Sequence, residues 1–132
     1  MVYQMIQSGV RKLDEVIEQA WVVEFLMRFK ALASKDRIVV FQRKDHIETL
    51  GALGILPHQA EETILGLTLE DYYKGAGESE RDGEEVCEFG ARVAGEEIYI
   101  KLIIDTARSK AICCSFHIAE RQISYPFTQD GT

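Results

Sequence analysis

The chain has 132 residues, of which 46% are hydrophobic and only two are prolines. This composition fits one compact domain, residues 1–132, and excludes a disordered protein. The apolar runs are too short to span a bilayer and no signal-peptide pattern begins the chain, so we expect a cytoplasmic protein without a membrane partner. Lys and Arg number 15 against 22 Asp and Glu, and the net charge of -7 argues against a general nucleic-acid coating protein.

The first half of the chain is predicted to be helical. Apolar residues recur at helical spacing over residues 14–33, which indicates one long amphipathic helix. Residues 38–74 are expected to hold a short strand at 38–41 followed by short helices. The first of these helices covers residues 46–53 and ends at Gly54.

Local capping signals set the remaining helix ends. Asp45 with Glu48 resembles a capping box for the helix at 46–53. Pro57 suits the first turn of the next helix, which is expected to end at Gly66. Thr68 with the acid three residues later predicts a further helical turn that carries residues 72–74.

The second half is predicted to be a sheet. Residues 75–83 are rich in glycine and charge and are expected to form an exposed loop. Over residues 84–118 the hydrophobic period becomes two, which predicts a three-stranded antiparallel meander with a tight turn at 94–95. The fold class is therefore α+β, with N-terminal helices packed on a small, mostly antiparallel sheet. The residues expected in the shared core are Phe25, Phe29, Leu32, Ile100, Leu102, Cys114 and Phe116.

Strand register brings polar residues together on one face of this meander. Burying both apolar sets favours pairing Ile104 with Ile112, which places Tyr99 opposite His117. The polar face then carries an acid, a phenol, a cation, a hydroxyl and an imidazole, the usual composition of an acid–base site. These residues are Glu88, Tyr99, Lys101, Ser115 and His117. A solvated sheet face with ordinary cross-strand pairs is the alternative interpretation.

The histidines and cysteines do not indicate a cofactor. His46, His58 and His117 lack ligand-like spacing to cysteines or acids, so we expect no metal and no other cofactor. The three cysteines lack the spacing of a zinc or redox site and are expected to be reduced thiols.

Four segments carry a resemblance to a known family. They are 66–74 (GLTLEDYYK), 87–90 (CEFG), 97–102 (EIYIKL) and 115–117 (SFH). In order and spacing they resemble the MqsR family of type II toxin–antitoxin toxins, over roughly residues 38–127. In that family a short helix ending in an aromatic pair and a lysine precedes the meander.

The resemblance implies a RelE-like fold and a metal-independent endoribonuclease that cuts messenger RNA and is inhibited by a cognate antitoxin. The family's catalytic lysine falls on Lys74, with Tyr73 beside it, and its tyrosine falls on Tyr99. Glu88 stands where the family has glutamine, and His117 stands where it has lysine. These two departures add a negative charge and replace a permanent cation by a titratable group.

Metal-free RNA cleavage uses the substrate's own 2′-hydroxyl as nucleophile, so the protein must accept one proton and donate another. We expect Glu88 or His117 to be the base, and the other, or Tyr99, to be the acid. Lys74 is expected to stabilise the phosphate. The further residues expected to contact single-stranded RNA are Tyr73, Lys101, Ser115 and Arg121.

The acidity of the chain keeps a second function open. Residues 57–97 hold 12 acidic residues against three basic ones, although RNA binding requires local positive potential. A catalytically inactive RelE-like protein that binds a protein partner is therefore the alternative to a ribonuclease. A positive rim formed by Arg43, Lys74, Lys101 and Arg121 would favour RNA.

Overall fold

The structure is a computed structural model that describes residues 2–128, with side chains described from residue 13 onward. It is an α+β fold, as the sequence predicts. The elements in chain order are α1 (Val2–Lys35), β1 (Val39–Val40), α2 (Lys44–Leu53), α3 (Pro57–Leu65), the 3-10 helix η1 (Leu69–Asp71), β2 (Tyr72–Glu78), β3 (Glu84–Val93), β4 (Glu96–Asp105) and β5 (Lys110–Ile118).

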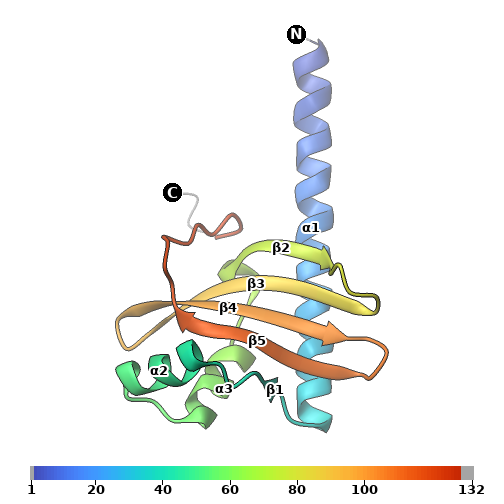
Figure 1. The fold of residues 1–132 in the computed structure, drawn as a ribbon. Helices are drawn as coiled ribbons and strands as arrows, with labels where there is room; N and C mark the ends of the chain where they lie inside the picture. Colours follow the sequence, from blue (N-terminus) through green and yellow to red (C-terminus); the bar gives the residue numbers. More distant parts are fainter. Residues whose placement is uncertain (1, 129–132) are drawn as a thin grey trace.

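Within the described residues the strands form one five-stranded sheet in the order β1-β5-β4-β3-β2. Neighbours from β2 to β5 are antiparallel, and only β1 runs parallel to its neighbour β5. The lower half of α1 packs along one face of the sheet, while its N-terminal half projects past the sheet (Figure 1). The other face of the sheet carries the polar side chains and is crossed by the segment that follows β5.

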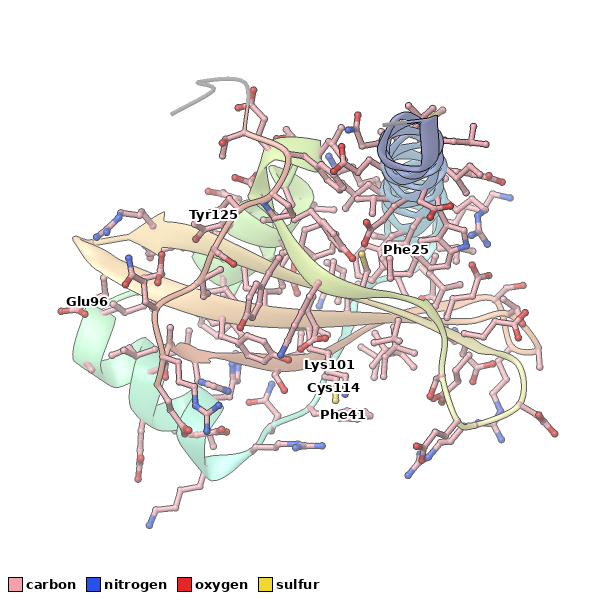
Figure 2. All side chains as sticks on the ribbon, turned by 90° about the horizontal axis from the view of Figure 1, so that it is seen from above. Phe25, Phe41, Glu96, Lys101, Cys114 and Tyr125 are labelled. Atoms are coloured by element: carbon pink, nitrogen blue, oxygen red, sulfur yellow. The ribbon has the colours of Figure 1, made fainter. Side chains whose placement is uncertain are left out.

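The core lies between α1 and the sheet. Phe25 points from α1 toward the strands (Figure 2) and is fully buried, as are Phe29 and Phe89. Ile100, Leu102 and Phe116 are buried as predicted, and Leu32 is half-buried against the same cluster. The helix begins at Val2 rather than at residue 14, and its buried apolar side chains are Val22, Phe25, Leu26 and Phe29 among the residues whose side chains are described.

The prediction for residues 72–78 is wrong, because Tyr72–Glu78 form strand β2 rather than a helical turn and the start of a loop, and the predicted loop is confined to residues 79–83. Tyr72 pairs with Phe89 and is buried. Register shifts interrupt the pairing, with Gly75 at φ 80° and Gly77 at φ 154°. Glycine adopts such angles without strain, so here it marks irregular strand pairing.

The helix caps follow the predictions in part. Gly54 ends α2 in the left-handed conformation, and α3 runs from Pro57 to the residue before Gly66 as expected. Thr68 forms the predicted capping box at η1. The box at Asp45 is wrong, because α2 begins at Lys44, two residues earlier than predicted, and its N-cap residue Arg43 has no side-chain cap.

Strands β3 and β4 pair without interruption, with Glu88 opposite Lys101 as predicted. They are joined by a tight turn in which Ala94 (φ 52°) and Gly95 (φ 82°) both have positive φ. This hairpin provides a regular frame for the side chains of the polar face.

Strand β5 contains a bulge that the sequence did not predict. Tyr99 faces His117 and Lys101 faces Ser115 as predicted. A register shift follows Lys101, so that Ile104 pairs with Ala111 rather than with Ile112. One extra residue reverses the side-chain alternation, because strand side chains have a period of two.

The bulge also corrects the predicted core. Cys113 takes the core position that was predicted for Cys114. Cys114 is buried on the polar side, where Arg43 approaches its sulfur. Nothing among the helices of the described part of the chain is long and apolar enough to cross a membrane.

Candidate active site

The polar face of the sheet carries a cleft of about 320 Å³. Its walls come from β2, β3, β4, β5 and the segment that follows β5. The lining residues are Tyr73, Lys74, Glu88, Tyr99, His117, Ala119, Glu120, Arg121 and Ile123. Six of the eight predicted site residues therefore meet in one cavity, although they are spread over about fifty positions of the chain.

The pairing of Glu88 distinguishes this face from an ordinary solvated sheet face. The Tyr99 hydroxyl donates a hydrogen bond of 2.5 Å to Glu88 Oε1. Lys101 stands directly across from Glu88, yet the ion pairs of the described residues include none between the two. The carboxylate therefore turns along the sheet into the cleft.

Tyr99 acts as a hydrogen-bond donor in this arrangement. Burial raises the pKa of its phenol, and the hydrogen bond to Glu88 raises it further. The phenol is therefore protonated at neutral pH, and it orients one carboxylate oxygen while the lone pairs of the other remain available.

The backbone of Gly75 lies against the second carboxylate oxygen of Glu88, Oε2. A Cβ placed on Gly75 would lie 2.1 Å from Glu88 Oε2, well inside van der Waals contact. The positive φ of Gly75 and this close approach both require glycine. The bulged strand β2 thus brings its backbone directly against the carboxylate.

His117 lies on the other side of Tyr99, with 5.2 Å between the two ring centroids. Its Nδ1 lies 3.0 Å from the Ile118 carbonyl oxygen, and since a carbonyl only accepts, Nδ1 carries a proton. Nε2 faces the Asp45 carboxylate at 3.9 Å. Nε2 is thus the nitrogen that can exchange a proton with a ligand.

Two cations reach the cleft from opposite walls. Lys74 is exposed on β2, with its ammonium nitrogen 4.9 Å from the centroid of the Tyr73 ring. Arg121 is exposed on the segment after β5. The lining also holds the carboxylates of Glu88 and Glu120, so two positive charges are balanced by two negative charges.

The segment after β5 forms one wall of the cleft. The Glu97 carboxylate accepts hydrogen bonds from the Ile123 amide (3.0 Å) and the Tyr125 hydroxyl (3.1 Å). A Cβ on Gly90 would lie 2.3 Å from the Tyr125 oxygen, so the absent side chain allows the segment to cross this face. Figure 2 shows Tyr125 on this segment as it crosses the sheet.

Two predicted residues, Lys101 and Ser115, lie outside the cleft lining although they share its face. Lys101 pairs with Ser115, the neighbour of Cys114, and Figure 2 shows Lys101, Cys114 and Phe41 at a similar position along the strands. Arg43 also lies there, with its guanidinium carbon 5.7 Å from the centroid of the Phe41 ring. The predicted positive rim is therefore split into Lys74 and Arg121 at the cleft and a second pair beyond it.

The sequence prediction missed several residues of the site. Asp45 was assigned to a helix cap, and Gly75 to a loop. Glu120 and Ile123 belong to a segment without strand periodicity, which carries no signal for its path across the sheet. The only sequence signal for this path was the pair of aromatic residues Tyr125 and Phe127, because large aromatic side chains are usually buried against the protein.

The cleft was also compared with the ligand clusters that bind metal ions. In the part of the chain with described side chains, no three or more His, Cys, Asp or Glu residues are grouped so that they could hold a metal ion. The polar groups of the cleft are suited to proton transfer and to contact with an anion.

Comparison with known proteins adds no identification: no family model matches the chain, and neither the curated proteins nor the solved structures contain a significant match.

Proposed function

We propose that the protein is a metal-independent endoribonuclease, the toxin of a type II toxin–antitoxin system, which acts on messenger RNA in the cytoplasm. The observation that carries this proposal is the joint placement of Glu88, Tyr99, His117, Lys74 and Arg121 around one cleft. The order and spacing of the four MqsR-like segments support the toxin role, a RelE-like relationship and a cognate antitoxin as protein partner.

In the proposed reaction Glu88 accepts the proton of the substrate's 2′-hydroxyl. The 2′-oxygen attacks the phosphorus, the bond from phosphorus to the 5′-oxygen breaks, and His117 Nε2 donates a proton to that leaving oxygen. The products are a 2′,3′-cyclic phosphate and a 5′-hydroxyl. Tyr99 lies between the two groups, hydrogen-bonded to Glu88 and beside the His117 ring.

The two exposed cations supply charge. Lys74 and Arg121 project from opposite walls of the cleft, where they neutralise charge that grows on the phosphate oxygens. Tyr73 is half-buried beside Lys74, so its ring is available to stack on an unpaired base.

The electrostatics keep one alternative in view, a catalytically inactive protein that binds a protein partner. Glu88 and Glu120 balance the two cations of the cleft, and Asp45 adds a carboxylate beside His117. Glu88→Gln separates the two functions. If Glu88 is the base, the cleavage rate falls; if it only repels phosphate, RNA affinity rises.

The experiment uses the full chain, mixed-sequence single-stranded RNA and a metal chelator, with and without ribosomes. We expect products with 2′,3′-cyclic phosphate ends and no cleavage of DNA of the same sequence, which lacks the nucleophile. Glu88→Gln and His117→Ala should each lower the rate by about 10²- to 10⁴-fold.

Matched controls are available on the surface. Glu96 lies at the β3–β4 turn and His58 on α3, and both are exposed, so Glu96→Gln and His58→Ala should leave the rate unchanged. Folded wild-type protein that cleaves no RNA in either condition, or equal loss in the control variants, would contradict the proposal.

A further inference from the structure

Helix α1 has a second apolar face that points away from the sheet. The five large side chains of this face are between 42% and 68% exposed, and the sixth residue is an exposed alanine. We call these residues the outer stripe: Leu13, Val16, Ile17, Ala20, Val23 and Met27. None of them is charged.

The outer stripe lies opposite the face that α1 buries. Ala20 and Phe29 are nine residues apart, which at about 100° per residue places them half a turn from each other. Phe29 is fully buried against the sheet. A helix that is apolar on two opposite sides is normally covered on both, yet among the described residues only the sheet-facing side is covered.

The spacing of the outer stripe fits another helix. Leu13, Ala20 and Met27 are seven residues apart, and Val16 and Val23 fall three residues after the first two of them. This alternation of three and four is the seam of a coiled coil. A lipid surface fits less well. The same part of the helix carries the acidic residues Asp14, Glu15 and Glu24, whereas anionic membranes attract basic residues.

We propose that this helix is the α1 of a second copy of the chain, paired antiparallel about a twofold axis at Ala20. Four residues of the outer stripe are related in pairs about Ala20, while the position that mirrors Val16 is Glu24 at the edge of the seam. Leu13 and Met27 lie seven positions to either side, and Ile17 and Val23 lie three positions to either side. A twofold interface requires such self-complementarity, and the small central residue allows the two helices to approach closely.

The antiparallel direction also solves a problem of the single chain. The N-terminal half of α1 projects past the sheet (Figure 1), and an isolated helix of that length is marginal in water. In the antiparallel pair residues 5–19 of each copy lie along residues 21–35 of the other, where the outer stripe contributes Val23 and Met27. Residues 5–35 then overlap over about 45 Å, roughly four heptads.

The first test is the oligomeric state of the full chain by sedimentation at micromolar concentration. We expect a dimer. Ile17→Glu should raise the dimer dissociation constant on the order of 100-fold, because each substitution occurs twice across a twofold interface. Ile47 on α2 is 57% exposed against 58% for Ile17, so Ile47→Glu is the matched control and should leave the dimer intact.

The second test fixes the direction by disulfide formation. A mixture of Leu13→Cys and Met27→Cys chains should cross-link, whereas Leu13→Cys alone should not, since two copies of residue 13 would lie about 21 Å apart in the antiparallel pair. The wild-type chain controls for its own cysteines, all of which are buried. A monomeric wild type, a dimer that Ile17→Glu leaves unchanged, or self-linked Leu13→Cys would overturn the proposal.

Discussion

Two tyrosine–glutamate pairs lie on opposite faces of the same sheet. On the core face the Tyr72 hydroxyl donates to Glu18 at 2.7 Å and also accepts the Ala76 amide at 3.1 Å. On the cleft face Tyr99 donates to Glu88 at 2.5 Å. Burial is the largest cause of the raised phenol pKa in both pairs, and the glutamate adds to it.

The surroundings give the two pairs different roles. Tyr72 is 1% exposed and its ring stacks on Phe127 at 5.5 Å between centroids. Its hydroxyl uses both its donor and its acceptor capacity within the protein. Tyr99 is half-buried at an open cleft beside His117. The Tyr72–Glu18 pair is thus part of the packed core, whereas the Tyr99–Glu88 pair leaves its carboxylate accessible from the cleft.

The largest expected effect is a loss of unfolding free energy on the core face, compared between two adjacent residues of β5 that point to opposite faces. Phe116 is 1% exposed in the core, whereas His117 is half-buried at the cleft. Phe116→Ala should lower the free energy of unfolding by about 3 to 5 kcal/mol, measured by urea denaturation. His117→Ala should lower it by less than about 1 kcal/mol. Equal losses would contradict the separation of the faces.

A smaller effect is expected at Gly75, whose backbone lies against Glu88. Gly75→Ala strains a position at φ 80° and displaces the carboxylate, so we expect a loss of about 1 to 2 kcal/mol in unfolding free energy together with slower RNA cleavage. Gly51 lies within α2 with open space around it. Gly51→Ala should therefore stabilise the protein slightly and leave cleavage unchanged.

Alkaline pH should weaken the core face. The pKa of Tyr72 is raised above its unfolded value near 10, so its contribution to stability is complete below that pH and is lost as pH rises further. Burial also raises the pKa of the Cys113 thiol to about 12. Unfolding free energy should therefore decline in alkaline solution, with a smaller slope above pH about 10 in Tyr72→Phe.

The smallest effect is expected at the ion pair between Arg28 of α1 and Glu85 of β3. The two side chains are joined by hydrogen bonds of 2.8 and 2.6 Å, and the hydrogen bond to Arg28 lowers the pKa of Glu85. This contribution is present above the unfolded pKa and is lost as pH falls through the folded one. Because Arg28 is partly exposed, Glu85→Gln should cost no more than about 1 kcal/mol near neutral pH.

Hydrophobic period and turn chemistry were sufficient to predict the middle of the fold. The β3–β4 hairpin, its turn at Ala94 and Gly95, and the pairing of Tyr99 with His117 are all confirmed. Each depends on local signals, namely alternation along the strand and a tight turn.

The remaining features depend on tertiary context. The bulge places Cys113 on the core face and Cys114 on the polar face. The hydrophobic alternation along the strand could not predict it, because both residues are apolar. Strand β2 was hidden by Gly75 and Gly77, which usually mark loops. The cleft wall formed by the segment after β5 depends on its hydrogen bonds to Glu97, a residue far from it in sequence.

The most direct test of the central claim, that only the cleft face performs chemistry, measures unfolding free energy and RNA cleavage rate on Tyr72→Phe and Tyr99→Phe together. Tyr72→Phe leaves the partly buried Ala76 amide and the Glu18 carboxylate without their hydrogen-bond partner, so it should lose about 1 to 3 kcal/mol of stability and keep its cleavage rate. Tyr99→Phe should keep its stability within about 1 kcal/mol and cleave at least about 10-fold more slowly, because Glu88 loses the donor that orients it. Unchanged cleavage in Tyr99→Phe, or the same stability loss in both variants, would contradict the account.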